Sequence, residues 1–164
     1  SMMLPAQVLM IPQYLWYQKL GWVGSYMPLT VPYFFAIQGF FVYLISNFIS
    51  GIPTELDEAA KIDGCSYAGI FTRIMLPLIK PALVTACIFS FMWRWNDYLW
   101  PKLVINGKER YTIQLALANY SGEYSVDWNS LLAMSVISMI PVIIVFVTLQ
   151  KYIIGGMTAG GVKE

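Results

Sequence analysis

Long uncharged apolar stretches alternate with short polar segments along this chain. No Asp, Glu, Lys or Arg occurs from Leu20 to Thr54 or from Trp128 to Gln150. An α-helix needs about 20 apolar residues, rising about 1.5 Å each, to cross about 30 Å of hydrocarbon, and both stretches are long enough. The pattern therefore predicts an all-α protein that crosses a membrane several times.

Four membrane segments are predicted in a single domain over residues 1–164, near 1–18, 27–50, 78–100 and 128–151. The third is the least clear, because only thirteen residues separate Lys80 from Arg94. It spans a membrane if Lys80 reaches one interface while Arg94 and Asp97 lie near the other, where their spacing lets them pair on one helix face. Residues 101–127 are predicted to form a polar loop with one short amphipathic helix at 113–120.

A polar helix–turn–helix is predicted at residues 53–77, between two apolar segments. Thr54 is a suitable N-cap, with Asp57 at the third helical position of a capping box. Gly64 can adopt the left-handed conformation that ends many helices. Ser66 is expected to cap a second short helix, which Pro77 then ends. This hairpin is the best-specified local structure in the sequence.

The composition agrees with a membrane protein and excludes several other classes. Hydrophobic residues make up 58% of the chain and charged residues 12%, while mean hydropathy is +0.61. A net charge of +1 argues against a nucleic-acid partner. The chain has no His, and its two cysteines show no metal-ligand spacing. We therefore expect no catalytic residue, no metal and no cofactor.

The hairpin carries a fixed pattern of seven residues, Glu58-Ala59-Ala60, Gly64, Ile74 and Leu76-Pro77. At roughly 5–10% occurrence for each residue, a chance match at a given start is on the order of 10⁻⁸. The pattern resembles the signature loop of inner-membrane permease subunits of binding-protein-dependent ABC importers. Further segments are similar to the carbohydrate-uptake branch: residues 11–12, 52–56, 62–64, 76–83, 150–152, the run Trp95-Asn96-Asp97-Tyr98-Leu99-Trp100-Pro101, and Gly156, Thr158, Gly160, Gly161 and Lys163 near the end.

The resemblance implies a polytopic membrane helical bundle with a MetI-like permease core, in the inner (cytoplasmic) membrane of a bacterium or archaeon. It is nearest to the second permease subunit of maltose and glycerol-phosphate systems. Such permeases usually have six membrane helices, so a chain with four is expected to be a carboxy-terminal fragment.

The resemblance also implies a set of partners. These are cytoplasmic ATP-binding subunits, a second permease subunit, an extracytoplasmic sugar-binding protein, the lipid bilayer and a carbohydrate substrate. The chain has no GxxxxGK[ST] phosphate-binding loop, so ATP hydrolysis is expected in a partner subunit. An ATP-independent channel or secondary transporter subunit is the alternative, and it would require a relay of ionisable residues within the membrane.

The resemblance places coupling to the ATPase on the hairpin, at Glu58, Ala59, Ala60, Lys61, Asp63, Gly64, Ile74, Leu76 and Pro77. Ala59 and Ala60 are small enough to let the first helix approach a groove closely, and Glu58 and Lys61 can add polar contacts at its rim. A hairpin that packs only on its own subunit is the alternative interpretation. 

Trp95, Asn96 and Asp97 are candidate path-lining residues, because aromatic rings stack on sugars and Asn and Asp bind hydroxyl groups. Aromatic residues at a helix end are also typical of interface anchors, and Arg94 and Asp97 can form a structural pair. The sequence leaves these alternatives open.

Overall fold

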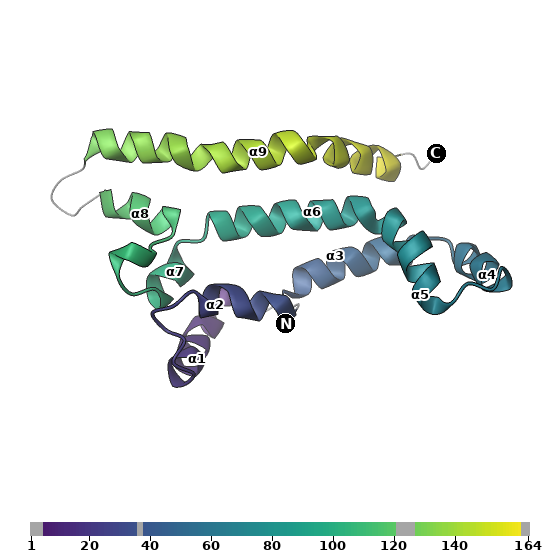
Figure 1. Ribbon diagram of the computed structural model, residues 1–164, viewed down its shortest axis with the longest axis horizontal. Helices are drawn as coiled ribbons and strands as arrows, with labels where there is room; N and C mark the ends of the chain where they lie inside the picture. The colour runs from purple at the N-terminus through teal and green to yellow at the C-terminus, as the bar shows by residue number, and fades with distance from the viewer. Residues whose placement is uncertain (1–4, 36–37, 121–126, 162–164) are drawn as a thin grey trace. The chain divides into compact units, whose positions relative to one another are not determined.

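The computed structural model describes residues 5–35, 38–120 and 127–161, with residues 151–161 described by their backbone alone. All secondary structure in these ranges is helical (Figure 1), which confirms the all-α prediction. The chain divides into two compact units, formed by residues 1–39 with 91–145 and by residues 40–90 with 146–164. Residues 1–4 of the first predicted membrane segment and Lys163 near the end lie outside the described residues.

The first unit contains α1 (Ala6–Lys19), α2 (Met27–Thr30), a 3₁₀ turn (Val31–Phe35), α7 (Leu99–Val104), a second 3₁₀ turn (Lys108–Arg110), α8 (Ile113–Tyr120) and the start of α9 (Trp128–Gly161). Its core is formed by Trp100, Val104, Ile105 and Leu115, with side chains of α1 packed against it. Two contacts fix the 20–26 loop to this core. The Gly24 amide donates to the Val104 carbonyl at 2.7 Å, and Arg110 donates to the Gly24 carbonyl.

The predicted membrane segment at 78–100 and the polar loop at 101–127 need correction. Helix α6 (Leu76–Trp95) ends before the predicted segment does, and α7 begins at Leu99. The Asn96 side chain donates to the Met92 carbonyl at 2.8 Å, and the Asp97 carboxylate accepts from the Trp100 amide at 3.4 Å. Such side-chain bonds compete with helix continuation. Within the predicted loop, Val104, Ile105 and Leu115 belong to the core of the first unit. Helix α8 confirms the short helix predicted at 113–120.

The second unit contains α3 (Gly39–Ser50), α4 (Glu55–Ile62), α5 (Tyr67–Ile70), a π-helical turn (Phe71–Met75) and most of α6. Helices α3 and α6 lie side by side (Figure 1), and Phe40 meets Phe89 edge to face with ring centroids 6.4 Å apart. Ile79, Ala82 and Ala86 are the buried residues of α6. Their spacing of three and four places them on one helix face.

Three helical stretches among the described residues are long and apolar enough to cross a membrane: Met27–Ser50, Tyr67–Trp95 and Trp128–Gln150. Each overlaps one predicted membrane segment. Helix α1 has 14 residues and is not among the three, so a membrane segment near 1–18 stays a prediction. Most α9 side chains from Leu132 to Val147 are exposed within the chain, as a helix facing lipid or another subunit requires.

Asp127 caps the start of α9. The sequence analysis missed this cap, although an Asp before an apolar run is a known signal for the start of a helix. Its carboxylate accepts from the Ser130 amide at 3.2 Å. Hydrogen bonds from the Ser130 hydroxyl and then the Ser130 amide hold the pKa of Asp127 below its ordinary value. The ionised Asp127 carboxylate therefore stabilises the first turn of α9.

We expect the first-turn amides of α9 to lose protection from hydrogen exchange only in acid, where the Asp127 carboxylate becomes protonated. A carboxylate with a lowered folded-state pKa contributes stability that is present above its unfolded pKa, about 3.9, and is lost as the pH falls through the lower folded value. Asp127→Asn keeps a capping oxygen without a charge, so its protection should not vary with pH over this window. An equal loss of protection in both proteins on acidification would contradict the assignment.

Candidate functional site

The hairpin at residues 53–77 begins differently from the prediction. Thr54 precedes α4, but its backbone is already helical, with φ −66° and ψ −23°, and its side chain makes no capping hydrogen bond. The Thr54 carbonyl instead accepts from the amides of Asp57 and Glu58, at 3.0 and 3.1 Å. A side-chain cap needs extended backbone at the capping residue, so the predicted capping box is wrong. Acidic side chains still occupy the positive end of the helix dipole.

The end of α4 confirms the left-handed glycine. Gly64 has φ +78°, its amide donates to the Lys61 carbonyl at 3.0 Å, and the Cys65 amide donates to the Ala60 carbonyl at 2.9 Å. This pair of bonds is a Schellman motif, which satisfies carbonyls that the helix end would leave unpaired. The Ser66 hydroxyl then accepts from the Gly69 amide at 3.2 Å and caps α5, as predicted.

The second helix does not end before Pro77. Helix α5 passes through the π-helical turn directly into α6, and the Leu76 amide donates to the Phe71 carbonyl five residues earlier. A proline inside a helix collides with the carbonyl four residues before it, which here belongs to Arg73. Widening the preceding turn by one residue relieves that collision. The second helix of the hairpin and the apolar helix α6 are therefore one continuous helical stretch, Tyr67–Trp95.

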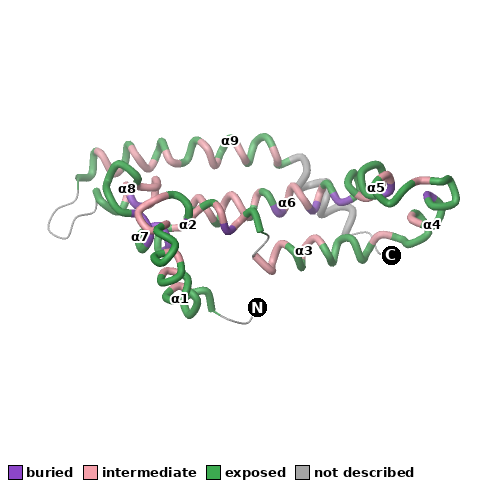
Figure 2. Tube along the Cα trace, turned by 60° about the horizontal axis from the view of Figure 1, so that its bottom comes forward, coloured by how far each residue is buried: buried purple, intermediate pink, exposed green. Residues whose placement is uncertain are grey.

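The two small residues of the hairpin face different surroundings. Ala60 is 4% exposed, so it is covered within the chain, whereas Ala59 is exposed. The most exposed large apolar residues of the hairpin are Ile62 and Tyr67, at 86% and 82% exposed, and Figure 2 shows most of α4 and α5 as exposed. The sequence analysis missed both, although an isoleucine and a tyrosine flanking the turn of a polar hairpin are a usable signal.

The other predicted coupling residues are mostly on the surface. Glu58, Lys61, Asp63, Gly64, Leu76 and Pro77 are exposed, and Ile74 is half-buried. The Lys61 ammonium lies 5.7 Å from the centre of the Tyr67 ring, which brings the two helices together at the exposed side of the turn. A cation over an aromatic face is attracted by the ring quadrupole. The hairpin thus presents a mixed apolar and charged surface with a fixed shape.

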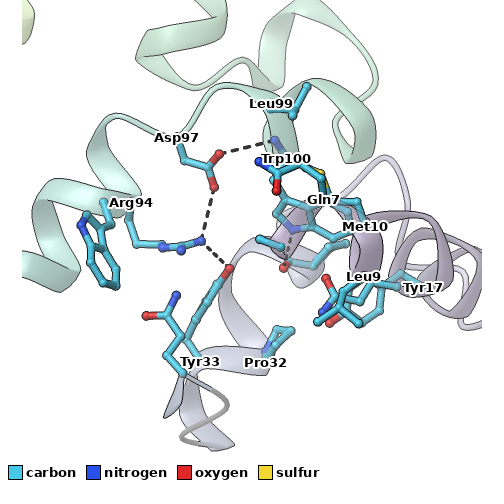
Figure 3. A pocket seen from close by; sticks show the side chains of 15 residues that line it. Gln7, Leu9, Met10, Tyr17, Pro32, Tyr33, Arg94, Asp97, Leu99 and Trp100 are labelled. Atoms are coloured by element: carbon cyan, nitrogen blue, oxygen red, sulfur yellow. Dashed lines mark hydrogen bonds and ion pairs between the residues drawn. The ribbon is translucent and has the colours of Figure 1, made fainter. Parts of the chain in front are cut away.

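A cavity of about 460 Å³ lies in the first unit, next to the Arg94–Asp97 pair. Its lining consists of Ala6, Gln7, Leu9, Met10, Gln13, Tyr17, Pro28, Pro32, Tyr33, Gln38, Trp93, Arg94, Asp97, Leu99 and Trp100. Arg94 Nη1 lies 3.3 Å from Asp97 Oδ2, which confirms the predicted pairing, and it also donates to the Tyr33 hydroxyl (Figure 3).

The three candidate path-lining residues separate in the structure. Asp97 lines the cavity, whereas Trp95 and Asn96 do not. The Trp95 indole donates to the Ser138 carbonyl of α9 at 3.2 Å and stacks on Phe91, while Asn96 closes the end of α6. The sequence analysis missed the cavity because its other wall comes from residues 6–38, far away along the chain. Among the described residues, no cluster of His, Cys, Asp and Glu could hold a metal ion.

Comparison with known proteins identifies the family. The family model described as "Binding-protein-dependent transport system inner membrane component" matches residues 1–158. The arabinooligosaccharides transport system permease protein AraQ of Bacillus subtilis is 37% identical over 99% of this chain and 57% of its own length. The trehalose/maltose transport system permease protein MalG of Thermococcus litoralis is 36% identical over 89% of this chain and 53% of its own length.

A solved structure supports the same assignment. The crystal structure of a bacterial ABC transporter involved in the import of the acidic polysaccharide alginate contains a chain with a TM-score of 0.72 and 30% identity, covering 87% of this chain and 55% of that one. The present chain spans a little more than half the length of these relatives. With its MetI-like permease fold and apolar helices, the chain is a multi-pass membrane protein that belongs to the family of binding-protein-dependent transport system inner membrane components.

Proposed function

We propose that this chain is part of the permease subunit of an ATP-driven, binding-protein-dependent sugar importer in the inner membrane of a bacterium or archaeon. It forms half of the translocation path with a second permease subunit. Cytoplasmic ATP-binding subunits supply the energy, and an extracytoplasmic sugar-binding protein delivers the substrate. Relatives whose names state transport of arabinooligosaccharides and of trehalose or maltose support the substrate class.

The observation that carries this proposal is the continuity between the exposed hairpin and an apolar helix. Helix α4 is joined to α5 by the turn that Gly64 and Ser66 fix, and α5 continues into α6 without a break. Helix α5 is capped by Ser66 at its start and continues into α6 at its end, so these helices move as one rigid piece. Force applied to the hairpin would therefore reach the apolar helix directly, through one helical stretch.

The surface of the hairpin suits a groove on an ATP-binding subunit. Ile62 and Tyr67 offer exposed apolar area beside the turn, and Glu58 and Lys61 offer charges around it. Interfaces of this kind have an apolar centre and a polar rim. The other predicted coupling residues shape the hairpin. Ala59 allows close approach, and Ala60 and Ile74 are covered within the chain. Asp63 and Gly64 form the turn, and Leu76 and Pro77 join the hairpin to α6.

The path-lining role falls to Asp97 among the three candidates. It faces the cavity and carries a charge balanced by Arg94, whereas the contacts of Trp95 and Asn96 hold the end of α6 in place. The Arg94–Asp97 pair is a single local contact near a helix end. A transporter that works without ATP would need a longer relay of ionisable groups, so this alternative gains no support.

The proposal is tested by purifying the full-length permease through an affinity tag and identifying what accompanies it. We expect a second permease and an ATP-binding subunit in the complex, and ATP hydrolysis in proteoliposomes should rise when the sugar-loaded binding protein is added. The same vesicles with an ATP-binding subunit that cannot hydrolyse ATP serve as the control. Sugar uptake at an equal rate in those control vesicles would contradict the proposal.

A further inference from the structure

The cavity next to Arg94 contains unused hydrogen-bonding groups. Gln7 and Gln13, which are exposed on α1, and the half-buried Gln38 line it, and no hydrogen bond joins their side-chain amides to another described residue. Arg94 Nε is buried and has no partner among the described residues. Each amide offers two donor hydrogens and one acceptor oxygen, and Nε offers one more donor. A ligand that both accepts and donates hydrogen bonds can therefore pair with these groups.

The fixed charges of the cavity cancel. Among the described residues, Arg94 and Asp97 are the only charged ones that line it, and their side chains are 3.3 Å apart. The guanidinium carbon also lies 4.4 Å from the centre of the Tyr33 ring, which holds the cation on one side of the cavity. An anionic ligand would meet the Asp97 carboxylate, and a cationic one would meet Arg94. The lining therefore favours a neutral polar ligand.

Four aromatic residues also contribute to the lining: Tyr17, Tyr33, Trp93 and Trp100. The cavity volume of about 460 Å³ falls within the range of about 300–1,000 Å³ that is usual for small-molecule sites. A saccharide matches this combination, because its C–H faces pack on rings while its hydroxyl groups both donate and accept. We propose that the cavity is a subsite for a neutral, hydroxyl-rich saccharide of about disaccharide size.

The side of the subsite that Trp100, Tyr33 and Arg94 form is held in shape before any ligand enters. Trp100 is 7% exposed, belongs to the core of the first unit, and its indole lies 3.5 Å from the Pro28 carbonyl on the opposite segment. The 3₁₀ turn that follows α2 carries Tyr33 next to Arg94 (Figure 3). Groups that are already positioned lose little conformational entropy when a ligand binds. The proposal rests on the proposed function only in taking a saccharide as the cargo.

The subsite is tested by equilibrium dialysis of the purified full-length transporter complex with radiolabelled maltose, trehalose and arabinobiose, and with digalacturonate as an acidic disaccharide. Gln13→Leu should raise the dissociation constant of the neutral disaccharide that binds by about threefold to tenfold, as loss of one or two neutral hydrogen bonds predicts. Arg94→Gln should weaken binding about tenfold or more, because a charged donor is lost. Gln18→Leu makes the same change at another exposed position of α1, one that does not line the cavity, and should have no effect.

The binding and ATP-hydrolysis measurements test the subsite and the proposed importer function separately. Equal binding by the Gln13→Leu and Gln18→Leu complexes would overturn the subsite, even if the sugar-loaded binding protein still stimulates ATP hydrolysis. Failure of all three neutral disaccharides to bind, or tighter binding of digalacturonate, would also overturn it. Saccharide binding that depends on Gln13, in a complex whose ATP hydrolysis ignores the binding protein, would support the subsite and count against the importer.

Discussion

Gly64→Val should abolish the stimulation of ATP hydrolysis by the sugar-loaded binding protein while leaving the permease in the membrane. Outside residues 63–65, no heavy atom lies within 4 Å of the position that a Cβ at residue 64 would take, so an added Cβ meets no steric clash there. The cost comes from the backbone, because a β-branched residue at φ +78° is strained by about 1–3 kcal/mol. Relieving that strain breaks the Schellman bonds to Lys61 and Ala60, and α4 then loses its fixed angle to α5.

The matched control is Gly64→Asn. Asparagine adopts the left-handed conformation more readily than other side-chain-bearing residues, so this variant should keep most of the stimulated ATP hydrolysis. Both variants are compared in proteoliposomes at equal permease content, with the basal rate measured in the same vesicles. If valine and asparagine reduce stimulation equally, the side chain itself matters and the proposed role of the backbone is wrong. Unchanged stimulation in the valine variant would remove the hairpin from the coupling step.

Glu58→Lys should reduce stimulated ATP hydrolysis at least tenfold without preventing membrane insertion. Glu58 is exposed in the first turn of α4, next to the surface that Ile62 and Tyr67 form. Under the proposed function, reversing its charge would replace a polar contact with repulsion at the rim of the groove on the ATP-binding subunit. The change also opposes the helix dipole, at a cost of only about 0.3–1 kcal/mol, which is too little to unfold the hairpin.

Glu55→Lys is the control for this prediction. It reverses an exposed charge in the same first turn of α4, so it carries the same dipole cost. The two complexes are compared by stimulated ATP hydrolysis and by the amount of ATP-binding subunit that copurifies with the permease. We expect the Glu55 variant to stay within about twofold of the unmodified protein, since its dipole cost is small. Equal losses in both variants would mean that the helix end is weakened, and that no contact is specific to Glu58.

Local features of the hairpin were predictable because neighbouring residues determine them. Gly64 ends α4 and Ser66 caps α5 as the sequence indicated, since each makes its bonds within five residues along the chain. Thr54 was predicted to cap α4 and does not, because a helical backbone at Thr54 already engages the first amides. Pro77 was expected to end a helix, but the π-helical turn before it lets the helix continue. Both corrections concern backbone geometry that residue preferences do not fix.

The sequence by itself determined the all-helical class, the positions of three long apolar stretches and the charged hairpin between two of them. These features follow from the period and spacing of residues close together in the chain, which need no folded partner. Only the tertiary structure decided that Trp100 belongs to a core, that Ala60 is covered while Ile62 and Tyr67 are exposed, and that Arg94 meets Tyr33 beside the amides of α1. Such contacts join residues far apart along the chain, 61 positions for Tyr33 and Arg94 and 86 for Gly24 and Arg110, so the preferences of neighbouring residues cannot predict them.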